Sequence, residues 1–86
     1  MPEICRFYGI VIRMYYNDHN PPHFHAHYSG QEAVVNIRTR AVISGRLPPR
    51  ALGLTSEWAS LHADELMEIW ARAREFEVLG KIDPLS

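Results

Sequence analysis

Apolar and polar positions alternate with a period of two along the first part of the chain, as they do in a strand with one buried face. The stretch from Ile4 to Tyr16 is rich in β-branched and aromatic residues and lacks the punctuation of a helix, so we predict extended structure. Gly9 marks a bulge or a bend between two short strands. Beyond it, one face carries Ile10, Ile12, Met14 and Tyr16, and the other carries Val11, Arg13 and Tyr15.

The alternation resumes after a proline-containing loop, in a strand with an unusual polar face. Residues 17–28 read NDHNPPHFHAHY and hold four of the five histidines. Two prolines remove consecutive ladder donors, which predicts a loop over residues 17–22. In the strand that follows, His23, His25 and His27 share one face. The other face carries Phe24, Ala26 and Tyr28, which we predict to be buried, whereas His23 and His25 keep solvent access.

The sheet region spans residues 1–47. In its second half, turn-forming residues predict two hairpins. Ser29-Gly30 suits a two-residue hairpin turn because glycine accepts a positive φ. That turn pairs the three histidines with the next strand: His27 with Glu32, His25 with Val34, and His23 with Asn36. A second turn at Thr39-Arg40 sets Ile37 against Val42.

From Pro48 the apolar period lengthens to that of a helix. Prolines in the first turn lose no intrahelical hydrogen bond, and the predicted stripe is Ala51, Leu54, Trp58 and Leu61. A second helix begins near Ala63 with the stripe Leu66, Ile69, Trp70 and Ala73. The two helices occupy residues 48–80, and residues 81–86 form a tail. We therefore predict one α+β domain over residues 1–86, with an antiparallel meander of about four strands and two C-terminal helices on one face.

Composition and charge exclude some classes of protein but do not identify a function. The single cysteine, Cys5, excludes an internal disulfide and suits a reducing compartment. The apolar run near the N-terminus is too short and too charged for a membrane span, so we expect a cytoplasmic protein that does not enter membranes. Residues 1–50 hold six arginines and three acids, a balance of +3, and residues 51–86 have a balance of −4. This split and the small core favour a homodimer or a protein partner, and RNA or DNA can bind the basic half.

Several motifs together resemble a known bacterial family. They are GIVIRMYYNDHNPPHFHAHY, then LPPRAL, EWA..H..EL...W and the closing KIDPL. In this order they resemble the domain-of-unknown-function 4160 family over nearly the whole chain. The resemblance implies a product of a compact two-gene unit, of a kind associated with toxin–antitoxin-like modules, and no assigned activity. His27 stands where members commonly carry an acid.

The histidine face is a candidate metal site. Alternate residues of a strand lie about 6.5–7 Å apart, so neighbouring imidazoles can converge on one ion. His23, His25 and His27 are the candidate ligands, and Glu32 or Asp18 can add a carboxylate to bind Zn, Ni or Fe. The alternative is that these histidines are polar surface residues that hydrogen-bond across the sheet.

A metal-free enzyme is a further hypothesis. Histidines beside arginines can exchange protons and stabilise a phosphorane-like charge, as a small ribonuclease requires. Its candidate catalytic residues are His23 and His25, with His19 as second proton carrier and Arg13 as a cationic partner.

We expect the chain to be an interaction module, one half of a two-gene, toxin–antitoxin-like system. Its protein partner would be encoded in the neighbouring gene, and the histidine face would make the contact. The alternative is an enzyme that uses His23, His25 and His27, either with a metal or as a metal-free ribonuclease.

Overall fold

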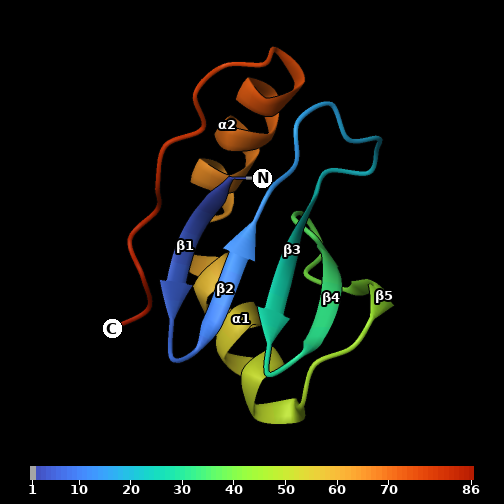
Figure 1. The fold of residues 1–86 in the computed structure, drawn as a ribbon, viewed down its shortest axis with the longest axis vertical. Helices are drawn as coiled ribbons and strands as arrows, with labels where there is room; N and C mark the ends of the chain where they lie inside the picture. Colours follow the sequence, from blue (N-terminus) through green and yellow to red (C-terminus); the bar gives the residue numbers. More distant parts are fainter. Residues whose placement is uncertain (1) are drawn as a thin grey trace.

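The computed structural model describes residues 2–86 as a five-stranded antiparallel sheet backed by two helices (Figure 1). The strands are β1 (Glu3–Phe7), β2 (Ile10–Arg13), β3 (His23–Tyr28), β4 (Gln31–Asn36) and β5 (Val42–Gly45), and they neighbour one another in chain order. The helices are α1 (Pro49–Leu61) and α2 (Ala63–Arg74). The predicted α+β meander is confirmed. The fifth strand arises because the bend at Gly9 is a complete hairpin turn that separates β1 from β2.

The register between β3 and β4 is the predicted one. His27 opposes Glu32, His25 opposes Val34 and His23 opposes Asn36. Ser29 and Gly30 both have positive φ, 49° and 80°, as a two-residue turn between twisted strands demands. This pairing matters for function because it places Glu32 on the same face as the histidines.

The predicted register between β4 and β5 is wrong. Val42 pairs with Val35 rather than with Ile37, and a register shift follows between Val34 and Val35. The cause is Asn36, whose side chain accepts hydrogen bonds from the N–H groups of Arg38 and Thr39 and so shapes a wider turn. Arg40 completes that turn with a φ of 63° and donates its N–H to the Asn36 carbonyl.

The two helices bury different fractions of their predicted stripes. All four stripe residues of α2 are buried, as predicted. In α1, Ala51 and Trp58 are buried but Leu61 is 67% exposed, and Thr55 and Ala59 complete the buried face instead. Leu61 is exposed because it ends α1 and the chain turns at His62 into α2. Within residues 2–86, no helix has the length and apolar character needed to cross a membrane.

The core lies between the sheet and the helices and includes residues near both ends of the chain. Ile10, Ile12, Phe24 and Ala26 are fully buried on the helix side of the sheet. The segment after α2 runs back along β1, where the Ile82 N–H donates to the Ile4 carbonyl at 2.9 Å. The C-terminal segment therefore covers the β1 edge of the sheet, and it buries Leu79 and Ile82.

Candidate functional site

The face of the sheet opposite the core carries all three strand histidines. Phe24 and Ala26 point into the core, as predicted, and Tyr28 is only partly buried. The histidine side chains are exposed to increasing degrees along β3: 9% for His23, 15% for His25 and 28% for His27. The prediction that His23 keeps solvent access is therefore wrong. The ring of Trp70 lies 5.1 Å from the His23 ring, so α2 covers this end of the strand.

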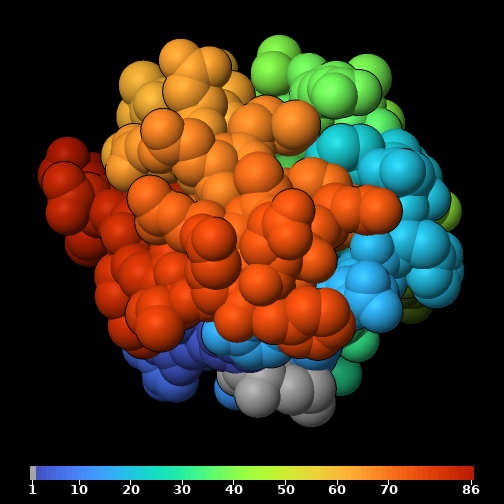
Figure 2. Space-filling model, turned by 90° about the horizontal axis from the view of Figure 1, so that it is seen from above, coloured from blue at the N-terminus to red at the C-terminus, as the bar shows by residue number. Residues whose placement is uncertain are grey.

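The loop before β3 is held in place at both ends. The Asn17 N–H donates to the carbonyl of Ala73 in α2, and the Pro22 carbonyl accepts the N–H of Ile37 at the end of β4. Viewed from above, this loop and the turn between β4 and β5 lie side by side next to α2 (Figure 2). The loop thus presents Asp18 to the histidine face from a fixed position.

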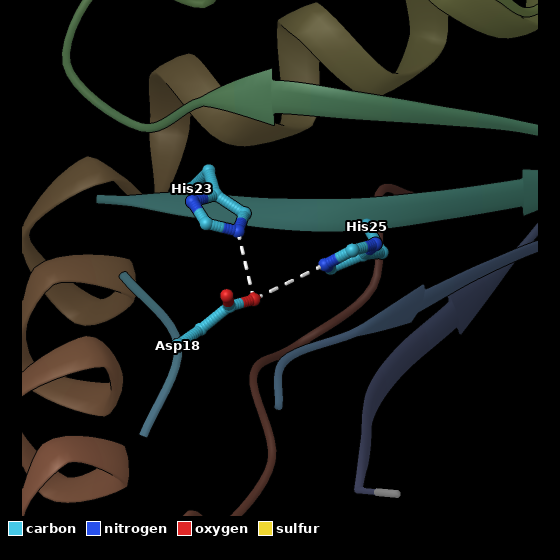
Figure 3. Close-up of side chains that lie close together, drawn as sticks. All are labelled: Asp18, His23 and His25. Carbon is cyan, nitrogen blue, oxygen red and sulfur yellow. Dashed lines mark hydrogen bonds and ion pairs between the residues drawn. The ribbon is translucent and has the colours of Figure 1, made fainter. Parts of the chain in front are cut away.

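Asp18, His23 and His25 form a compact cluster (Figure 3). The Oδ2 atom of Asp18 lies 2.9 Å from His23 Nε2 and 3.5 Å from His25 Nε2. One ligand atom from each of the three residues lies within 4.8 Å of the other two. Bonds of about 2.0–2.2 Å to a shared metal ion separate neighbouring ligand atoms by about 3–3.6 Å. The 3.5 Å distance to His25 lies within that range, and the 2.9 Å distance to His23 is just below it.

Each imidazole of the cluster is oriented through its other nitrogen. His23 Nδ1 lies 2.6 Å from the Pro21 carbonyl oxygen, which can only accept, so Nδ1 carries a proton and donates. His25 Nδ1 lies 2.7 Å from the Glu32 carboxylate and donates to it. His25 Nε2 is buried and has no hydrogen-bond partner within residues 2–86. Metal-binding histidines are usually fixed in this way, by a carbonyl or carboxylate on the nitrogen that does not bind the metal.

The Asp18 carboxylate is stabilised in its charged form. Burial alone would raise the pKa of Asp18, but the hydrogen bonds with the His23 ring and the His19 N–H outweigh it and hold the pKa below its ordinary value. With the His23 Nε2 proton displaced, the ionised carboxylate and the two imidazole nitrogens form a negatively charged, three-atom donor set. It suits a divalent cation.

Comparison with known protein families decides where the chain belongs. The model of the family described as "Domain of unknown function (DUF4160)" matches residues 9–71. The chain is a member of the DUF4160 family. Neither the curated proteins nor the solved structures contain a significant match. The matched part of this DUF4160 chain contains Asp18, His23, His25 and Glu32, so the whole cluster and its orienting carboxylate lie inside it.

A cavity of about 300 Å³ opens beside the cluster. Asp18, His23 and His25 line it, and Val34, Ile43 and Ser44 form the wall on the side of β4 and β5. Three protein ligands leave coordination positions for water or substrate, which is the arrangement of catalytic rather than structural zinc sites. A small molecule in this cavity would lie against the side chains of Asp18, His23 and His25.

The other residues singled out in the sequence lie around this cluster rather than in it. Glu32 contacts His25 from the far side, and its Oε2 lies 3.7 Å from His27 Nε2. His27 lines a separate cavity of about 310 Å³ with Val11 and the hairpin turn. The His19 side chain is 96% exposed, with Nδ1 3.7 Å from Asp18 Oδ1. Arg13 on β2 pairs with His25 on the neighbouring strand β3.

Three contacts of the site were not apparent in the sequence. The Pro21 carbonyl fixes His23, the Trp70 ring covers it, and the Tyr15 ring packs edge-on against His25 at 4.3 Å. The predicted strand pattern put Tyr15 on the face of Arg13, which was a usable signal for the last contact. A backbone carbonyl and a helix docked at the end of a strand leave no comparable signal.

Proposed function

We propose that this DUF4160 chain is a small metalloprotein that holds one divalent transition-metal ion through Asp18, His23 and His25. One observation carries the proposal: both imidazoles are fixed through Nδ1, and both direct Nε2 at the same carboxylate oxygen. A set of two histidines and one carboxylate suits iron(II) and is also compatible with zinc or nickel. The ion would act as a Lewis acid on a bound water or substrate oxygen.

The donor set gives Glu32 a different role from the one suggested by the sequence. Its carboxylate already accepts the proton of His25 Nδ1, so it orients a ligand and raises its basicity instead of binding the ion. His27 Nε2 faces Glu32 rather than Asp18. The metal proposal therefore rests on Asp18, His23 and His25 and leaves His27 outside the donor set.

The metal-free ribonuclease has weaker support than the metal site. His19, its second proton carrier, points into solvent, and Arg13 donates no side-chain hydrogen bond to the cluster within residues 2–86. Acid–base catalysis requires two proton carriers within reach of the same substrate atoms. The cluster supplies two imidazoles whose Nε2 atoms converge on one carboxylate, which is more suitable for a cation.

Binding of a partner is the second candidate function. It is the expectation for one half of a two-gene, toxin–antitoxin-like system, whether the partner is another small protein or a second copy of this chain. The observation that favours it is the exposure of β5, where Val42 and Ile43 are 38% and 46% exposed.

Metal analysis of the protein purified without a histidine tag tests the first proposal. We expect close to one equivalent of a divalent transition metal per chain. After chelation, adding zinc or iron(II) should raise the melting temperature, because a ligand that binds only the folded state stabilises it. Affinity should fall at acidic pH, since protons compete for the imidazoles. A metal-free protein whose melting temperature does not respond to these ions would contradict the proposal.

Substitution of Glu32 by Gln tests how the site is built. The amide can still accept from His25 Nδ1 but has no charge, so we expect zinc affinity to fall by roughly 10–100-fold. Titration calorimetry or competition with a chelating dye measures the change. Glu57→Gln is the matched control, because Glu57 is an exposed acid on α1 far along the chain from the cluster. Equal affinity in the two variants would show that Glu32 does not position His25.

A further inference from the structure

One edge of the sheet is covered by the C-terminal segment, and the other edge is not paired within residues 2–86. At β1, the Ile82 N–H donates to the Ile4 carbonyl and Lys81 Nζ donates to the Glu3 carbonyl. At the other edge, β5 pairs with β4 alone, and no strand within residues 2–86 lies beyond it. All four residues of β5 are exposed. An edge strand with unpaired N–H and C=O groups is a template for another strand.

The composition of β5 does not protect it from pairing. Besides short strands and bulges, soluble proteins guard an exposed edge by composition, with lysine, proline or an inward-pointing charge. Between Val42 and Gly45 the sequence is Val-Ile-Ser-Gly, with none of these. Gly45 has a φ of 72°, and a Cβ there would overlap the Glu32 carbonyl oxygen, so β5 lies tightly against β4. The side that remains accessible is the outer one.

The residues around β5 define the charge of its occupant. Arg38 and Arg40 precede the strand and Arg46 follows it, and all three are exposed. None of the ion pairs within residues 2–86 includes any of them. The carbonyl of Glu32 accepts the N–H of Arg46, but the Glu32 carboxylate is engaged by His25. The edge is thus an apolar centre with a positive charge at each end.

We propose that β5 binds an extended peptide segment of a protein partner, with an apolar centre and acidic residues at both ends. The peptide would add a sixth strand through backbone hydrogen bonds, and its end charges would meet Arg40 and Arg46. A second copy fits less well, because antiparallel pairing of two β5 strands brings Arg40 of one copy close to Arg46 of the other. The inference rests on partner binding, the second candidate function, and is independent of the metal site.

Single-stranded RNA is the competing occupant of a basic edge. Binding without sequence preference relies on aromatic side chains that stack on the bases. No aromatic residue occurs between Ile37 and Leu47. The exposed apolar groups at this edge are the aliphatic side chains of Val42 and Ile43. These observations favour a peptide over RNA.

Two synthetic peptides test the proposal. Both carry the same alternating valine–threonine centre; one has glutamates at each end and the other lysines. By NMR titration we expect the glutamate peptide to shift the amide signals of Val42–Gly45 and slow their hydrogen exchange. It should bind at least tenfold more tightly than the lysine peptide, with an advantage that shrinks as salt is added. The proposal is overturned if the glutamate peptide leaves these amides unchanged, or if a single-stranded oligonucleotide of equal charge binds them more tightly.

Matched variants separate this edge from the rest of the molecule. Arg46→Glu should abolish the preference for the glutamate peptide, whereas Arg74→Glu, the same charge reversal at the end of α2, should leave it unchanged. His25→Ala, which removes a metal ligand, should bind the peptide as wild type does. If His25→Ala loses peptide binding, the edge does not act independently of the metal site and the proposal is overturned. If Arg46→Glu and Arg74→Glu have equal effects, only the net charge of the protein matters, and the proposal is overturned as well.

Discussion

Replacing His25 by alanine is expected to lower zinc affinity by two to three orders of magnitude while the chain stays folded. Structural zinc sites with four ligands bind with roughly 10–16 kcal/mol, or about 2.5–4 kcal/mol per ligand. Loss of one ligand then costs roughly 100–1000-fold in affinity. The fold loses one hydrogen bond to Glu32, whose side chain is 44% exposed, and the edge-on contact with Tyr15, and each contributes about 0.5–1.5 kcal/mol. Calorimetry and thermal melting measure the two effects separately.

His19→Ala is the control for this prediction. His19 neighbours Asp18 in the same loop, but its side chain is 96% exposed, so neither zinc affinity nor stability should change. If His25→Ala binds zinc as tightly as the wild type does, His25 is not a ligand of the proposed site. A variant that changes both His23 and His25 is a poorer test, because His23 is buried against Trp70 and its loss should also weaken the fold.

Replacing Trp58 by alanine should destabilise the protein by about 3–5 kcal/mol, the usual cost of deleting a large buried aromatic side chain. Trp58 is fully buried and packs against Phe7 and Phe24, at ring-centroid distances of 5.4 and 5.9 Å. Its Nε1–H also donates to the Asp83 carbonyl at 2.9 Å. In a domain of this size each kcal/mol lowers the melting temperature by about 4–8 °C, so the expected drop is about 12–40 °C.

Leu61→Ala is the matched control on the same helix. Leu61 belongs to the same predicted stripe as Trp58 but is 67% exposed, so its truncation should change stability by about 0.5 kcal/mol or less. Thermal or denaturant unfolding of both variants decides the matter. If Leu61→Ala costs as much as Trp58→Ala, the helix faces the sheet as the sequence alone predicts and not as the structure has it.

The sequence predicted those parts of the fold that local chemistry determines. Ser29-Gly30 fixes its turn by backbone preference, so the pairing of His27 with Glu32 followed directly. The turn after β4 depends on where the Asn36 side chain directs its oxygen, so the position of Val42 could not be read from residue types. Leu61 was misplaced for a similar reason, because a periodic stripe does not reveal where a helix stops facing the core.

The sequence predicted which types of residue make the candidate site, but not which individual residues belong to it. Period two placed His23, His25 and His27 on one face and made them look equivalent. What distinguishes them is tertiary: the loop brings Asp18 to one end of the face, α2 covers His23, and Glu32 lies beside the other end. Asp18 was one of two acids that the sequence offered, and only the path of the loop separates its position from that of Glu32.

The contact between the C-terminal segment and β1 bears on where this domain can be cut. The family match covers residues 9–71, so β1 and the segment after α2 both lie outside it. Yet these two segments hydrogen-bond to each other and bury Ile4, Phe7, Leu79 and Ile82 in the common core. A fragment trimmed to residues 9–71 would turn β2 into a bare edge and open the core on that side. The cooperative folding unit is thus longer than the segment by which the family is recognised, and fragments for expression need both flanks.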